Sequence, residues 1–132
     1  MTEEHVIQTQ KKIELINLTS VVQSAVVKSG VREGACLVCT PHTTVGMLVN
    51  EDEIGLISDL MQTLERLVPE RADYRHSDGN APAHIKACLI GSEKHFVVRA
   101  GRLVLGTWQS IFLCEFDGPR SRKVLVRVAG ER

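Results

Sequence analysis

Three histidines in the middle of the chain, His42, His76 and His84, have the side chains most able to do chemistry. Each is expected at a corner or at a helix entry, where protein scaffolds often place functional groups. Imidazole is a frequent zinc ligand, so the three could share a divalent metal ion if their segments converge. The alternative is that each is an ordinary hydrogen-bonded histidine. His5 and His95, in polar surroundings, are expected to face solvent.

Two carboxylates near the same segments, Glu51 and Asp59, could complete a metal shell, orient a histidine or act as a general base. Glu51 has a purely structural alternative, because the first turn of a helix attracts acidic residues through the helix dipole. Asp59 precedes Leu60 in an expected helix and lies close to its buried side, where a carboxylate would need a partner.

Two later segments carry further polar groups. Thr107 and Gln109 flank Trp108, the only tryptophan, and could line a pocket, although core packing is the preferred interpretation for the indole ring. The turn at 117–123 contains three cations, Arg120, Arg122 and Lys123. Such a turn can hold a phosphate through arginine and backbone N–H groups, and a solvated basic hairpin is the alternative.

Cys36 and Cys39 have the CxxC spacing of zinc and redox motifs. They fall in an apolar strand pattern, however, where residues three apart point to opposite faces of a sheet. No second CxxC completes a set of four ligands. The preferred interpretation is that they are reduced, structural cysteines.

Composition limits the possible partners. The 132 residues suit one domain, 1–132, and the 16 basic and 16 acidic side chains cancel. This balance, with an aromatic content of 4%, gives no general attraction to nucleic acid or to a membrane surface. No apolar run reaches bilayer length, and the polar start of the sequence is unlike a secretory signal, so we expect a cytoplasmic protein.

Helices are expected in three segments that must position the candidate residues. The first starts at a Ser20–Gln23 capping box and ends at Gly30. The longest runs from about Asn50 to Leu67, with its apolar residues at helical spacing. The third starts at Asn80 and reaches Leu89.

The remaining segments read as short strands. They are expected as two strands within 5–18 and as strands at 35–40, 45–49, 96–99, 102–105, 108–115 and 123–128. Many short antiparallel strands with two or three helices predict an α+β fold, a small antiparallel β-sandwich with flanking helices.

Three blocks together resemble the signatures of the YjbQ-like family, in family order over roughly residues 10 to 130. The first is Pro41-His42-Thr43-Thr44 followed by Asn50-Glu51. The second is the His-x-x-Gly-Asn-x-x-x-His pattern from His76 to His84. The third runs from Gly101 to Gln109 and continues from Glu115 to Arg120.

This resemblance implies a jelly-roll-like sandwich that assembles as a homotrimer with its site near a subunit boundary. Members of the family are often labelled secondary thiamine-phosphate synthases. The resemblance marks His42, His76 and His84 as the metal or catalytic histidines. The candidate catalytic residues are then His42, Glu51, Asp59 and Gln109, and the candidate substrate-binding residues are Thr43, Asn50, Asn80, Thr107 and Arg120.

The leading hypothesis is a metal-assisted enzyme that acts on a small phosphorylated molecule, as a thiamine-phosphate synthase-like transferase would. Three histidines suit zinc or another transition metal better than magnesium, which prefers oxygen ligands. A zinc-dependent hydrolase with Glu51 or Asp59 as its base is one alternative. A trimeric module that binds a small ligand or metal without turnover is the other.

Overall fold

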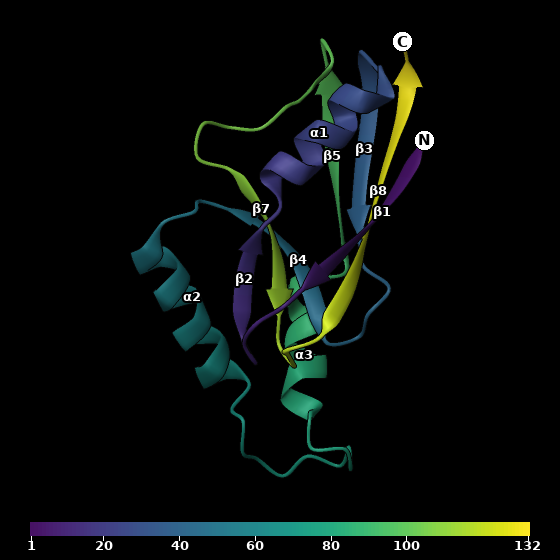
Figure 1. Ribbon diagram of the computed structural model, residues 1–132. Helices are drawn as coiled ribbons and strands as arrows, with labels where there is room; N and C mark the ends of the chain where they lie inside the picture. Colours follow the sequence, from purple (N-terminus) through teal and green to yellow (C-terminus); the bar gives the residue numbers. More distant parts are fainter.

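Two antiparallel sheets and three helices make up the computed structural model, which describes residues 1–132 (Figure 1). The predicted α+β class with antiparallel strands is therefore confirmed. The larger sheet has the order β1-β8-β3-β5-β6 and the smaller the order β2-β7-β4. The strands are β1 Thr2–Gln8, β2 Glu14–Asn17, β3 Glu33–Cys39, β4 Val45–Asn50, β5 Glu93–Arg99, β6 Arg102–Leu103, β7 Ser110–Glu115 and β8 Ser121–Glu131.

The main core lies between the two sheets. It combines buried side chains of β3 and β8, such as Val38 and Val126, with Met47 of β4 and Leu113 of β7. Helix α1 (Thr19–Ser29) adds Val22 and closes one end of this core. Burial of such side chains provides the main driving force for holding the sheets face to face.

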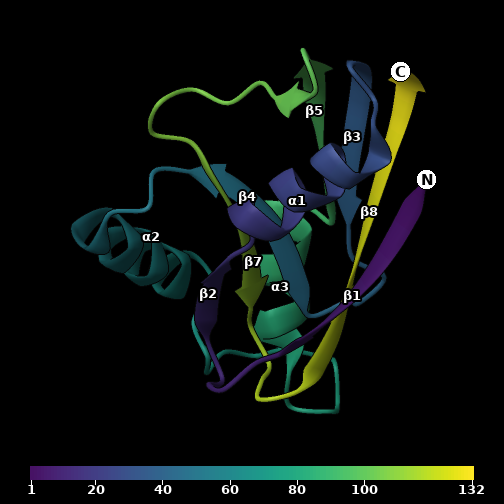
Figure 2. The ribbon, with the colours of Figure 1, turned by 45° about the horizontal axis from the view of Figure 1, so that its top comes forward.

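The other two helices, α2 (Ile54–Leu67) and α3 (Ala81–Ile90), cover the outer face of the smaller sheet (Figure 2). Their apolar side chains form a second cluster with Cys114 and Phe116 at the end of β7 and just beyond it. Lys86 of α3 is buried and bonds to Glu65 of α2 through Nζ and Oε2 at 3.0 Å, which ties the helices together. None of the three helices combines the length and apolar character needed to cross a bilayer.

Two helix starts differ from the sequence prediction. The Ser20–Gln23 capping box is absent, because Gln23 Oε1 accepts from the Leu103 N–H at 3.2 Å instead. Helix α2 starts at Ile54 rather than Asn50, because Asn50 pairs with Ser110 as the last residue of β4. The carboxylate of Glu53 then caps α2 by accepting from the Gly55 and Leu56 N–H groups.

Three side-chain placements were also predicted wrongly. Trp108 is 71% exposed rather than packed in the core, and Asp59 is exposed rather than close to a buried face. His5 is half-buried and bonds to Glu3 at 2.8 Å, whereas His95 is exposed as expected. The CxxC pair behaves as structural cysteines in a strand, with Cys36 buried and neither thiol in a disulfide.

A buried ion pair joins the sheets at one end of the molecule. Glu115 is the last residue of β7 and Arg122 is the second residue of β8. Both side chains are almost inaccessible to water, at 0% and 3% exposure. Arg122 donates from Nε to Glu115 Oε1 at 2.8 Å and from Nη2 to Oε2 at 2.6 Å. Thr9 donates to Glu115 at 2.7 Å, and Thr44 accepts from Arg122 at 2.8 Å. Four chain segments therefore meet at one carboxylate–guanidinium pair.

Replacing Arg122 with Met should lower the free energy of unfolding by about 3–5 kcal/mol, because Glu115 would be left charged and unpaired in the interior. The matched change Arg66→Met, at an exposed position on α2, should cost about 0.5 kcal/mol or less. Urea unfolding followed by circular dichroism measures both. Equal midpoints for the two variants would contradict a structural role for the pair.

Candidate functional site

The loop between β3 and β4 borders a hollow of about 580 Å³ that contains two of the three candidate histidines. His42 lines it from the loop and His84 lines it from α3, together with the predicted ligand-binding residue Thr43. Cys88 lies one helical turn after His84 and lines the same hollow. A cavity with several convergent polar groups is the usual form of a small-molecule site.

Close packing of α3 on β4 sets the position of His84. A Cβ atom on Gly46 would lie 2.8 Å from the Ile90 Cγ2 atom and 3.1 Å from the Gly91 carbonyl oxygen. Only glycine allows this approach, and the Met47 N–H donates to the same carbonyl at 2.9 Å. The end of α3 is thus fixed to the strand that follows His42.

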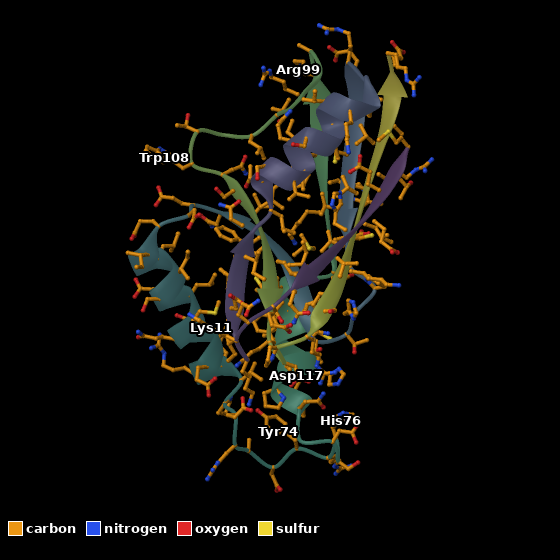
Figure 3. All side chains as sticks on the ribbon, in the orientation of Figure 1. Lys11, Tyr74, His76, Arg99, Trp108 and Asp117 are labelled. Carbon is orange, nitrogen blue, oxygen red and sulfur yellow. The ribbon has the colours of Figure 1, made fainter.

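His76 lies outside the hollow but beside His84. Their ring centroids are 4.9 Å apart in an edge-to-face arrangement, and His76 Nε2 lies 3.7 Å from Asp78 Oδ2. His76 is on the exposed loop before α3, at the lower right in Figure 3. No group of three or more His, Cys, Asp or Glu side chains in the chain is arranged to hold a metal ion. The residues present therefore do not fit the expected three-histidine metal site within one chain.

The turn after β7 brings two more of the predicted residues together. Asp117 accepts from Asn80 Nδ2 at 2.9 Å and from Arg120 Nη2 at 3.0 Å. Asn80 immediately precedes α3 without capping it through its side chain, and its buried Oδ1 accepts no hydrogen bond within the chain. Gly118 is required here, because a Cβ atom would overlap the Lys11 carbonyl oxygen and lie 2.9 Å from Thr9 Oγ1.

Positive charge surrounds His42. Its Nε2 accepts a hydrogen bond from the Lys123 backbone N–H at 2.9 Å. Burial, followed by the charges of Arg122, Lys123 and Arg120, holds the pKa of His42 below its ordinary value, although Glu115 acts in the opposite direction. His42 is therefore neutral at neutral pH. Of the three cations, Arg122 and Arg120 are paired with Glu115 and Asp117, which leaves Lys123 as the one without a carboxylate partner.

Glu115 itself stays ionised. Burial alone would raise the pKa of its carboxyl group, but hydrogen bonds from Arg122, the Asp117 N–H and Thr9 outweigh this effect and lower the pKa. The carboxylate is fully occupied by these donors, so its role is to hold Arg122 and the turn in place.

The other predicted site residues lie elsewhere in the chain. Asn50 is the last residue of β4 and Glu51 follows it. At 3.4 Å per residue, Asn50 lies about 17 Å from Val45, where β4 begins next to the His42 loop. Asn50 and Glu51 border a different, small hollow beneath α2. Thr107 and Gln109 flank the exposed Trp108 at the opposite end of the molecule from His76 (Figure 3). Gln109 borders a separate hollow of about 360 Å³ beside His95. Asp59 lines neither of these two hollows.

Sequence reasoning missed three residues that matter to the site. Glu115 and Arg122 were not recognised as a pair. The alternation of β8 could have placed Arg122 on its inward face, but β7 is buried from Ile111 to Glu115 and gives no such signal for Glu115. Cys88 was not singled out, although its spacing of four from His84 places the two on one helix face.

Solved structures with the same fold cover nearly the whole chain. A Sulfolobus solfataricus protein described as YbjQ-like and of unknown function superposes with a TM-score of 0.97 at 38% identity, covering 99% of this chain and 97% of that one. A Clostridium acetobutylicum protein of the yjbq/upf0047 family gives a TM-score of 0.94 at 41% identity, covering 96% and 99%.

Sequence relatives give the same result. A UPF0047 protein of Archaeoglobus fulgidus is 44% identical over 126 residues, which is 94% of this chain and 98% of the relative. The YugU protein of Bacillus subtilis is 39% identical, with 94% and 96% covered. The family model described as UPF0047 protein YjbQ-like matches residues 3–131. The chain belongs to the YjbQ-like family.

Proposed function

We propose that the protein is an enzyme that acts on a small phosphorylated substrate bound in the hollow between His42 and His84. The observation that carries this proposal is that one hollow brings His42 and His84 together, with the charges of Arg120, Arg122 and Lys123 close enough to lower the pKa of His42. Phosphoryl oxygens are stabilised by such preorganised positive charge and by N–H donors.

His84 is the group in the hollow that can exchange a proton with a bound substrate. It lines the hollow from α3, whereas His42 lines it from the β3–β4 loop, and the His84 ring packs edge-to-face against His76. Imidazole titrates near neutral pH and can act as a general acid or base. A hydrolase would use it to accept a proton from water.

The family resemblance suggests a particular transfer. In the thiamine-phosphate synthase reaction, the thiazole nitrogen forms a bond to the methylene carbon of the pyrimidine pyrophosphate. The carbon–oxygen bond breaks, and pyrophosphate leaves with the electron pair. Donors and cations around His42 would stabilise the leaving group, which gains negative charge as it departs.

A metal-assisted form of the reaction is a second candidate, favoured by the His76–His84 pair. The two rings lie side by side, with centroids 4.9 Å apart, and these residues would hold a transition metal ion, which would supply a Lewis acid to the phosphoryl oxygens. The chain offers no third ligand of its own. A neighbouring copy or the substrate would have to complete the coordination.

Product formation from the two thiamine precursors, and phosphate release from small phosphate esters, test the activity. His84→Ala should lower the rate by about 100-fold or more, the usual effect of removing a general acid or base. His5→Ala, which changes a histidine on β1 outside the hollow, should leave the rate unchanged. Equal rates for the His84 and His5 variants would contradict the proposed site.

Metal analysis of the same proteins tests the second candidate. Bound transition metal should be lost in His76→Ala and kept in His5→Ala.

Occupancy of the hollow can be followed through Cys88, the exposed thiol among the four cysteines. Burial raises the pKa of Cys36 to about 11 and that of Cys114 to about 12, so these thiols should react slowly. Iodoacetamide should modify Cys88 first, and pyrophosphate should slow this reaction by covering the thiol. Mass spectrometry measures the rates, with Cys39 as the internal control. Unchanged labelling of Cys88 at high pyrophosphate concentration would mean that the anion does not bind there.

We further propose that the protein is a homotrimer built on the outer face of the larger sheet. No helix covers this face, whereas α2 and α3 cover the outer face of the smaller sheet. Alternate residues of its strands expose apolar groups, including Val97 of β5 at 52% and Val6 of β1 at 64%. Such an assembly could bring Glu51 or Gln109 of one copy towards the hollow of another copy. This would explain why both residues lie far from the hollow of their own chain.

Light scattering should therefore report a mass close to three times 14.6 kDa. Val97→Glu should dissociate the assembly, because a charge would be buried at the contact. Val27→Glu, a matched change at a 61% exposed position on α1, should leave the mass unchanged. A wild-type mass of one chain at micromolar concentration would contradict the trimer.

A further inference from the structure

The backbone of Lys123 lies where the larger sheet loses a strand. Strand β3 pairs with β8 only as far as Cys39 opposite Leu125. Beyond this point two side chains replace the strand as partners of Lys123. Thr40 Oγ1 donates to the Lys123 carbonyl at 3.0 Å, and His42 Nε2 accepts from the Lys123 N–H at 2.9 Å. His42 thus continues the hydrogen-bond ladder of the sheet through its ring.

This contact decides where the imidazole proton lies. A ring nitrogen that accepts a hydrogen bond must have a free lone pair, so the neutral ring carries its proton on the other nitrogen, Nδ1. The opposite tautomer would set an Nε2–H group against the Lys123 N–H. Nδ1 has no partner within the chain and is not sealed from solvent. The ring itself lines the hollow.

The buried ion pair fixes both segments that form this contact. Arg122 immediately precedes Lys123, and its guanidinium is held by both carboxylate oxygens of Glu115. The same guanidinium donates to Thr44, two residues after His42. The Lys123 N–H and the His42 loop are therefore both attached to one buried pair.

We propose that His42 is held as its Nδ1–H tautomer and donates this hydrogen bond into the hollow, to an oxygen of a bound phosphoryl or carboxyl group. Lys123, through its backbone, and the Glu115–Arg122 pair are positioning residues for this donor. The hydrogen bond to a bound ligand, the ligand half of this inference, rests on the proposed function. The assignment of the Nδ1–H tautomer does not. His42 is then neither a metal ligand nor a proton acceptor in this inference.

The tautomer can be measured directly on the wild-type protein. Long-range ¹H–¹⁵N correlation spectra of ¹⁵N-labelled protein at pH 8 distinguish a protonated from an unprotonated ring nitrogen. His42→Gln, which removes one set of ring signals, gives the assignment. We expect a single Nδ1–H form for His42. A predominant Nε2–H form, or an even mixture of the two, would overturn the inference.

Two amide substitutions separate the roles of the two ring nitrogens. The asparagine amide branches from Cγ, as Nδ1 does, so His42→Asn can keep a donor towards the hollow. The glutamine amide reaches the position of Nε2, so His42→Gln can keep the Lys123 contact but loses that donor. With inorganic phosphate as the probe, His42→Gln should weaken binding by about 10- to 100-fold, and His42→Asn by clearly less.

The outcomes distinguish the inference from the proposed function. Tighter binding by His42→Gln than by His42→Asn would assign the ligand contact to Nε2 and overturn the inference. An equal loss of phosphate binding in both variants would also overturn the inference, because either substitution removes a histidine that acts as a metal ligand or as a base. An Nδ1–H tautomer in a wild-type protein that binds neither phosphate nor acetate would contradict the ligand half and the proposed anion site together. His42 would then serve only as a cap of the sheet.

Discussion

The buried contact between the Glu115 carboxylate and the Arg122 guanidinium is the interaction on which the arrangement of the site depends. Two charges in the interior are tolerable only when their hydrogen-bonding capacity is satisfied. Here the remaining partners come from Thr9 at the end of β1 and Thr44 after the His42 loop. The need to satisfy the pair therefore selects one geometry for the loops around it, and the hollow takes its shape from those loops.

Much of the fold could be predicted because periodicity and turn residues act locally. The strands and the three helices follow from alternating or helical spacing, and Gly30 ends α1 with a positive φ of 71° as expected. Helix starts were less predictable, because polar side chains there have several possible partners. Gln23 accepts a hydrogen bond from Leu103, and Asn50 pairs with Ser110 of β7. Both partners are distant in sequence and are brought close only by the tertiary structure.

The candidate site was predictable in part for the same reason. His42 and His84 were correctly expected at element ends, and the structure places both on one hollow. Asp59 was wrongly placed because successive residues of a helix point in different directions, so its neighbour Leu60 faces the sheet while Asp59 faces solvent. Trp108 was wrongly placed because an exposed loop cannot be read from the residue type alone. The Arg122 side chain looked like one of three equivalent surface cations, and only its pairing across the sheets distinguishes it from Arg120.

The pairing of β1 with β8 joins residues from opposite ends of the described chain, such as Thr2 with Arg127 (Figures 1 and 2). β8 also pairs with β3 across roughly ninety residues of intervening sequence, a separation typical of slow, millisecond-to-second folding. During synthesis, β3, β5 and β6 can pair with one another, but β1 and one edge of β3 stay unpaired until β8 has left the ribosome. Arg122 and Lys123 lie on that last strand. The His42–Lys123 contact and the buried Glu115–Arg122 pair would therefore be among the last to form, and a chain that stalled before β8 would lack both.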